Sequence, residues 1–252
     1  MQRSFLQYLE RQAQRAQGKG FGAKSHDVEV RAALPFLPKT DAVVFDVGAN
    51  RGLWARALLD AAGARVGIVY CIEPSRHNHP VLAALPDKQV ILIKEALSDS
   101  AGRQMLRSDI EGSGIASLAE RNLDHYGISM NLQEEVSVTT LDAIIAERRI
   151  TRIDFAKFDV EGYEYKAFLG GENALSSGVV RALAFEFGGC NIDTRTYFRD
   201  FWYFLTERNY AIARIRPAGR PKRIAQYHES EENFLVSNFI AWRIDIFPDG
   251  AG

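Results

Sequence analysis

Short apolar runs alternate with longer helix-like segments along most of the chain. The apolar runs are rich in Val, Ile, Leu and Phe and lie at residues 42–47, 65–73, 90–97, 153–160 and 180–187. Continuous runs of this length are typical of parallel strands that helices cover on both faces. Helices are predicted between them at residues 52–62, 76–84, 141–148, 163–176 and 196–208. The pattern therefore predicts an α/β fold with an open, mostly parallel sheet.

The segments before and within this alternation have a different character. Phe5, Leu6, Tyr8 and Leu9 lie close to helical spacing, so residues 3–17 predict an amphipathic helix packed on the domain or on a second subunit. We expect it to stop near three glycines, Gly18, Gly20 and Gly22. Residues 98–138 contain SDSAG, EGSGIAS and the alternating EEVSVTT, which predict a hairpin and a loop that could act as a lid.

The last part of the chain predicts two more strands. They lie in YAIARIRP and NFLVSNFIAWR, and AGRPKRIAQYHESEE between them predicts an exposed loop. The expected organisation is an N-terminal helical extension at residues 1–40, one domain at residues 41–247 that includes the insertion, and a flexible tail at residues 248–252.

Composition excludes several classes of partner. The 31 Lys and Arg residues nearly balance the 32 Asp and Glu residues, so no overall field recruits nucleic acid. No apolar stretch is long enough to cross a membrane or to act as a signal peptide. Cys71 and Cys190 have no metal-type spacing and predict two reduced thiols. We therefore expect a cytoplasmic protein without membrane insertion, for which a homodimer is a candidate assembly.

The stretch AVVFDVGANRGLW at residues 42–54 places an acid and two glycines where a strand gives way to a helix. Ligands of open parallel sheets bind at this edge, and glycines allow a close backbone approach. The acid in D-x-G-x-N-x-G would repel a diphosphate and attract a cationic ligand, which argues against NAD. Glu73, at the end of the next apolar run, could accept hydrogen bonds from both hydroxyls of a ribose. Together these features predict S-adenosylmethionine as the ligand.

A second group of candidates lies in KFDVEGYE. Lys157 and Asp159 share one face of a strand, and Glu161 follows at its tip. Such groups are costly to bury without a purpose, although a structural ion-pair network is the alternative. Asp159 is the first candidate for the base that removes a proton from an acceptor hydroxyl. Glu161 could share that work or hold a divalent metal, which nothing in the sequence demands, and Lys157 could pair with either acid or stabilise an alkoxide.

Two further side chains are weaker candidates for the same site. Glu186 ends the following apolar run and could face the acceptor. His125, in the insertion, is the best placed histidine for a catalytic role, although an exposed loop position is its simpler interpretation.

The chain resembles the FkbM-type methyltransferases, a family of Rossmann-like S-adenosylmethionine-dependent enzymes. The matching elements are FDVGANRG, IEPS, EALSDSAG, VTTLDAII, IDFAKFDVEGYEYKAFLGG and AFEFGG, which together cover about residues 40 to 190. The resemblance implies a class I methyltransferase fold with a seven-stranded, mostly parallel sheet whose last strand is antiparallel.

The resemblance also implies roles for the matching residues. Asp46, Gly48, Ala49, Asn50 and Gly52 would surround the methionine part of the cofactor, Glu73 and Pro74 the ribose, and Ala96, Leu97, Ser98 and Asp99 the adenine. The expected activity is O-methylation of a hydroxyl on a sugar, glycan precursor or secondary metabolite. N-methylation, an inactive cofactor-binding module and an NAD-linked oxidoreductase are the alternatives.

Overall fold

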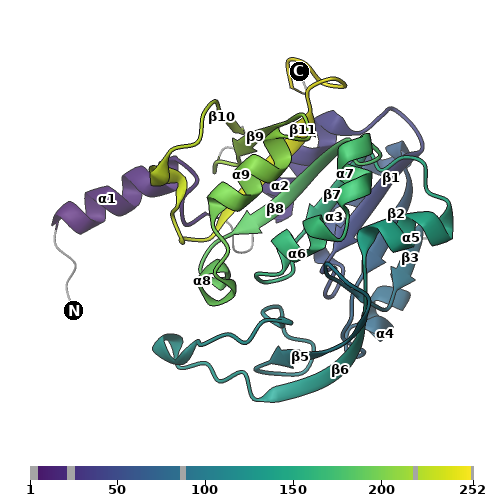
Figure 1. Ribbon diagram of the computed structural model, residues 1–252, viewed down its shortest axis with the longest axis horizontal. Helices are drawn as coiled ribbons and strands as arrows, with labels where there is room; N and C mark the ends of the chain where they lie inside the picture. The colour runs from purple at the N-terminus through teal and green to yellow at the C-terminus, as the bar shows by residue number, and fades with distance from the viewer. Residues whose placement is uncertain (1–4, 22–25, 86–88, 218–220, 251–252) are drawn as a thin grey trace.

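The computed structural model describes residues 5–21, 26–85, 89–217 and 221–250, and within them one large sheet organises the chain (Figure 1). Its strand order is β10-β9-β11-β8-β7-β1-β2-β3. The strands are β1 (Ala42–Val47), β2 (Val66–Ile72), β3 (Val90–Ile93), β7 (Phe155–Phe158), β8 (Ala182–Phe187), β9 (Tyr210–Arg214), β10 (Lys222–Ile224) and β11 (Ser237–Arg243).

The sheet confirms the predicted mixed topology. Strands β3, β2, β1, β7 and β8 pair in parallel, whereas β11 runs antiparallel between β8 and β9. The short strand β10 was not predicted, because its three residues lie in the polar segment that we expected to be an exposed loop. They pair antiparallel with β9 at the edge of the sheet, where only one neighbour is needed.

Helices cover both faces of the sheet, each over its own apolar core. One face carries α5 (Leu141–Arg148), α6 (Glu164–Leu169), α7 (Glu172–Ser177) and α9 (Phe198–Thr206). The other carries α2 (His26–Ala33), α3 (Leu53–Ala62) and α4 (His79–Ala83). In α9, Phe198, Phe201, Phe204 and Leu205 recur at helical spacing and are buried, and each such side chain stabilises the fold by about 1.5–3 kcal/mol.

Two predicted elements are divided in the structure. The apolar run 90–97 forms β3 and then β4 (Ala96–Leu97), which pairs with β6 in a second sheet. The predicted helix 163–176 is broken between α6 and α7 at Gly170 and Gly171. A Cβ on Gly170 would lie 2.0 Å from the Ser98 carbonyl oxygen, so the break accommodates the loop that follows β4.

The insertion forms the predicted hairpin. Strands β5 (Gly102–Ser108) and β6 (Leu132–Thr139) pair antiparallel along their whole length. They arch away from the carboxyl ends of the main strands, and the 109–131 segment between them turns back toward those ends (Figure 1).

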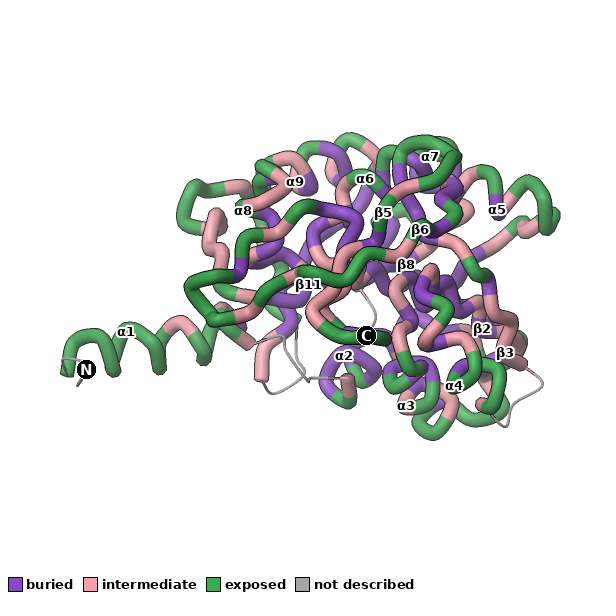
Figure 2. Tube along the Cα trace, turned by 90° about the horizontal axis from the view of Figure 1, so that it is seen from below, coloured by how far each residue is buried: buried purple, intermediate pink, exposed green. Residues whose placement is uncertain are grey.

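The N-terminal helix α1 (Phe5–Ala16) has no buried residue and projects from the domain (Figure 2). Packing on the domain, one of its two expected settings, is therefore wrong for this structure. Gly22 and the tail residues 251–252 lie outside the described residues. No helix in the described ranges is both long and apolar enough to cross a bilayer.

Candidate active site

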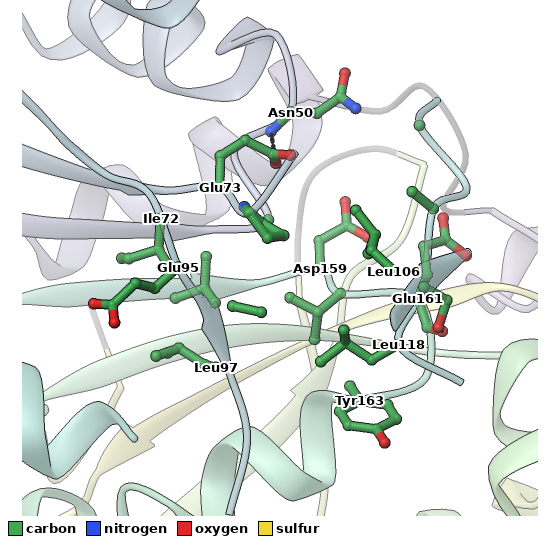
Figure 3. Close-up of a pocket in the computed structure, with 18 of the residues that line it drawn as sticks. Asn50, Ile72, Glu73, Glu95, Leu97, Leu106, Leu118, Asp159, Glu161 and Tyr163 are labelled. Carbon is green, nitrogen blue, oxygen red and sulfur yellow. Dashed lines mark hydrogen bonds between the residues drawn. The ribbon is translucent and has the colours of Figure 1, made fainter. Parts of the chain in front are cut away.

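A cavity of about 540 Å³, measured with its open mouth, lies at the carboxyl ends of β1, β2 and β7 (Figure 3). Of the predicted site residues, eight line it: Gly48, Asn50, Glu73, Pro74, Ala96, Leu97, Asp159 and Glu161. The structure thus brings together residues from four separate motifs.

Glu73 forms one wall of the cavity at the end of β2. Its Oε2 accepts the backbone N–H of Asn50 at 2.8 Å, and its Oε1 accepts the Ser75 N–H at 2.9 Å and the Asn78 side-chain amide at 3.1 Å. Burial raises the pKa of Glu73, and these three donors act in the opposite direction. A carboxylate has about four acceptor sites, so Oε2 retains capacity for a ligand hydroxyl.

Gly48 allows the loop after β1 to approach the end of β7 closely. Its φ is +78°, and a Cβ there would lie 1.9 Å from the Asp159 carbonyl oxygen. Only glycine combines this left-handed backbone with the close approach. Gly48 therefore sets the distance between the loop after β1 and the turn that carries Asp159 and Glu161.

Asp159 and Glu161 line the same cavity as Glu73, and Asp159 lies between Glu73 and Glu161 in the view of Figure 3. The Lys157 ammonium donates to Oδ2 of Asp159 at 3.0 Å. Glu161 follows with φ +54°, a conformation that is strained for a residue with a side chain. Burial, with a further contribution from Asp159, raises the pKa of Glu161 to about 7. A carboxyl group that titrates near neutral pH suits general acid–base work.

Asp46 does not line the cavity, contrary to the role expected for it beside the ligand. Val47 faces the cavity, and strand alternation turns Asp46 to the opposite face of β1. There its fully buried carboxylate lies 3.7 Å from the Lys157 ammonium. Burial raises the pKa of Asp46, and Lys157 opposes that shift. Asp46 thus acts on the site only through Lys157. The Lys157 side chain does not line the cavity, but it donates to Asp159, which does.

The remaining expected contacts also lie outside the cavity lining. The Ala49 backbone N–H donates to the Ile72 carbonyl, and Gly52 is the N-cap of α3. Ser98 is fully buried, and Asp99 pairs with Lys166 at 2.7 Å. The segment after β3 therefore lines the cavity with Glu95, Ala96 and Leu97, whereas Asp99 pairs with Lys166 of α6.

His125 is exposed within a short helical turn of the insertion and does not reach the cavity. Its ring packs on neighbouring Tyr126, with ring centroids 4.2 Å apart. The structure thus favours the simpler interpretation of this histidine as an exposed loop residue.

Several lining residues were not among the expected ones. Glu95 and Tyr163 lie within the motifs EALSDSAG and KFDVEGYE, close to predicted residues. Their position in those motifs could therefore have identified them from the sequence. The others come mainly from the insertion, for which the sequence has no local signal: Leu106, Ser113, Gly114, Ala116, Ser117 and Leu118. The Asn50 side-chain amide donates to the Ser113 carbonyl at 2.9 Å, so Asn50 holds this segment over the cavity.

Glu161, Glu186 and Cys190 each place one donor atom within 4.8 Å of the other two. Burial raises the pKa of the Cys190 thiol, whereas metals bind the thiolate. Burial also raises the pKa of Glu186, and the nearby Asp159 and Glu161 add to that effect. Because the group offers two carboxylates and a neutral thiol, we assign no metal to it.

Comparisons with known proteins agree with this architecture. The family model described as the methyltransferase FkbM domain matches residues 46–212. A crystal structure of methyltransferase FkbM from Methylobacillus flagellatus is 17% identical, with a TM-score of 0.50, over 81% of this chain and 44% of that chain. At this identity the likeness shows the fold alone.

More distant structures were also found. The SAM-dependent methyltransferase from Agrobacterium tumefaciens is 13% identical over 86% of this chain and 60% of that chain, with a TM-score of 0.44. Aeropyrum pernix fibrillarin with bound S-adenosyl-L-methionine is 13% identical over 84% of this chain and 74% of that chain, with a TM-score of 0.42. The chain spans only about half the length of the Methylobacillus flagellatus structure. The search of curated proteins found no match. Since the family model covers more than half of the 252 residues, the chain belongs to the FkbM methyltransferase family.

Proposed function

We propose that the protein transfers a methyl group from S-adenosylmethionine to a hydroxyl oxygen of a sugar, glycan precursor or secondary metabolite. One observation carries this proposal. Glu73, at the end of β2, and Asp159 and Glu161, just after β7, line the same cavity.

The residues of the cavity fit the cofactor chemically. Glu73 would accept hydrogen bonds from the ribose, since its Oε2 has capacity left beside the Asn50 N–H. Apolar side chains from β2, β4 and the insertion, among them Ile72, Leu97 and Leu118, suit a planar adenine ring. When bound, S-adenosylmethionine supplies an electrophilic methyl group on a positively charged sulfur. The negative charge of Asp159 and Glu161 favours a cationic ligand over a neutral one.

We assign the roles of orienting group and base to Asp159 and Glu161 respectively. The sequence favoured Asp159 as the base, but a cation engages both carboxylates, Lys157 that of Asp159 and Arg121 that of Glu161, so the pairing does not decide between them. Burial raises the pKa of Glu161 to about 7, where a carboxylate can accept a hydroxyl proton effectively. A base of this kind contributes roughly 10²–10⁴-fold to a rate, and holding the acceptor hydroxyl in place contributes further.

Two experiments test the proposal in sequence. Calorimetric titration with S-adenosylhomocysteine and with NAD should detect binding of the first and none of the second. Radiolabelled methyl transfer from S-adenosylmethionine to a panel of sugars, glycan precursors and hydroxylated metabolites should then identify an acceptor, and NMR of the product should place the new methyl on oxygen. Tight cofactor binding without transfer to any acceptor would favour a binding module, and a methylated nitrogen would favour N-methylation.

A further inference from the structure

The insertion holds Glu161, in the turn after β7, from two directions. The Ser117 hydroxyl donates to the Glu161 carbonyl oxygen at 2.7 Å. The Arg121 guanidinium donates to Oε2 of Glu161 at 2.6 Å. Both partners belong to the segment between β5 and β6, so the segment over the cavity holds the main chain and the side chain of Glu161.

The Arg121–Glu161 ion pair is largely withdrawn from water. The side chains are 9% and 17% exposed, and Arg121 also lies 3.8 Å from Asp193 of α8 (Cys190–Thr194). Charges in such a setting are screened less than surface charges, and removal of one partner leaves the other buried and uncompensated. The pair therefore has more influence on Glu161 than a surface ion pair would have.

The surroundings of Glu161 are otherwise mainly acidic. The titratable and charged groups that face it or its partner are Lys157, Asp159, Glu164, Glu186, Cys190, Arg121 and Asp193. Among these described groups the cations are Lys157 and Arg121, and Lys157 lies between Asp159 and Asp46. Arg121 is thus the cation that contacts Glu161 directly.

We propose that Arg121 is a positioning residue that, from the segment over the cavity, fixes the Glu161 carboxylate beside Asp159 and favours its charged form. Burial raises the pKa of Glu161 and the guanidinium acts in the opposite direction, so loss of Arg121 with the segment still in place favours the protonated form. The segment that covers the cavity thus also prepares the base. This proposal rests on the function proposed above.

The charge of Glu161 can be measured through ligand binding without an acceptor. S-adenosylmethionine carries a positive sulfur and S-adenosylhomocysteine a neutral one, so the ratio of their affinities reports nearby negative charge. Calorimetric titrations with both ligands from pH 5.5 to 9 should show a preference for the sulfonium that rises through about pH 7 in the unaltered protein.

In Arg121→Met this rise should move to higher pH by about one to three units, the usual effect of an opposite charge at this distance. The preference at pH 7 should then fall several-fold. Arg121→Lys should recover much of it, because the charge is kept, and Glu161→Gln should show only the pH dependence of the ligands themselves. Arg103→Met is the matched control, because Arg103 forms an exposed pair with Glu135 on the same hairpin and should change nothing.

An unchanged transition in Arg121→Met, or a transition that persists in Glu161→Gln, would overturn the proposal. Failure of the parent to bind either ligand at any pH would instead overturn the proposed function. In that case, carbon-13 NMR titration of glutamate carboxyl groups would decide the role of Arg121, with Glu161→Gln identifying the resonance. A thermal melt of each variant separates these effects from loss of folding.

Discussion

The backbone N–H of Asn50 donates a 2.8 Å hydrogen bond to Oε2 of Glu73, which joins the loop after β1 to the end of β2. Glu73 therefore holds the loop after β1 in place, in addition to its proposed role of binding the ribose. Its other oxygen is held by Ser75 and Asn78, so the carboxylate is fixed before any ligand arrives. Such preorganisation lowers the cost of binding.

Glu73→Gln should weaken S-adenosylhomocysteine binding at least about tenfold, since a hydrogen bond from a ribose hydroxyl to a charged acceptor contributes about 1.5–3 kcal/mol. The amide nitrogen of glutamine cannot accept a hydrogen bond, so one of the three present donors loses its partner. Calorimetry measures the affinity. Glu134→Gln is the matched control, because Glu134 accepts from the Ser75 hydroxyl and the Arg76 N–H outside the cavity lining. Equal affinity in Glu73→Gln and parent would remove Glu73 from the site.

The reaction rate should depend on pH through Glu161. Its pKa is raised to about 7, so below that pH the carboxyl is protonated and cannot accept the hydroxyl proton. With any acceptor found by the transfer screen, kcat/KM should rise with pH through about 7 and then level off. Glu161→Gln should lower kcat by about 10²–10⁴-fold and abolish this rise. If the rise survived in Glu161→Gln and vanished in Asp159→Asn, the base would be Asp159.

Gly48→Ala should destabilise the fold and abolish cofactor binding together. The added Cβ would lie 1.9 Å from the Asp159 carbonyl oxygen, and the backbone is in the left-handed region. Strain and overpacking together should lower the free energy of unfolding by at least about 2 kcal/mol. Thermal and urea melts measure this loss. Gly189→Ala, where φ is −59° and the nearest contact is an ordinary 3.8 Å, should have little effect.

Asn50→Gly should loosen the segment over the cavity without straining the loop. Asn50 has φ +47°, which glycine adopts readily, so the variant loses mainly the side-chain bond to the Ser113 carbonyl. Hydrogen exchange of residues 110–118 should become faster, while exchange in β1 and β2 stays the same. Unchanged exchange in the segment would show that the amide does not hold it.

Asp46→Asn should change cofactor affinity less than about threefold, because Asp46 faces away from the cavity and acts through Lys157. The melting temperature should fall, since the buried pair with Lys157 is lost and a polar amide remains buried. Titration with S-adenosylhomocysteine and a thermal melt separate the two effects. A loss of affinity well above tenfold with an unchanged melting temperature would restore the direct contact that the sequence predicted.

Local patterns in the sequence determined the framework of this protein. Apolar runs and helical spacing predicted the central strands and helices, because burial on both faces of a sheet demands continuous apolar strands. The acids and glycines at the ends of those runs predicted part of the cavity lining, including Gly48, Glu73 and Asp159, because parallel strands bring their carboxyl ends to one edge.

Only the tertiary structure decided which of these side chains face the cavity and what covers it. Asp46 turned to the other face of β1, where it pairs with Lys157, since one residue of strand register separates the two faces. Arg121 reached Glu161 across 40 residues of sequence, and Ser113 reached Asn50 across 63. Contacts of this range depend on how the hairpin folds back over the sheet, so no periodicity or spacing within the chain encodes them.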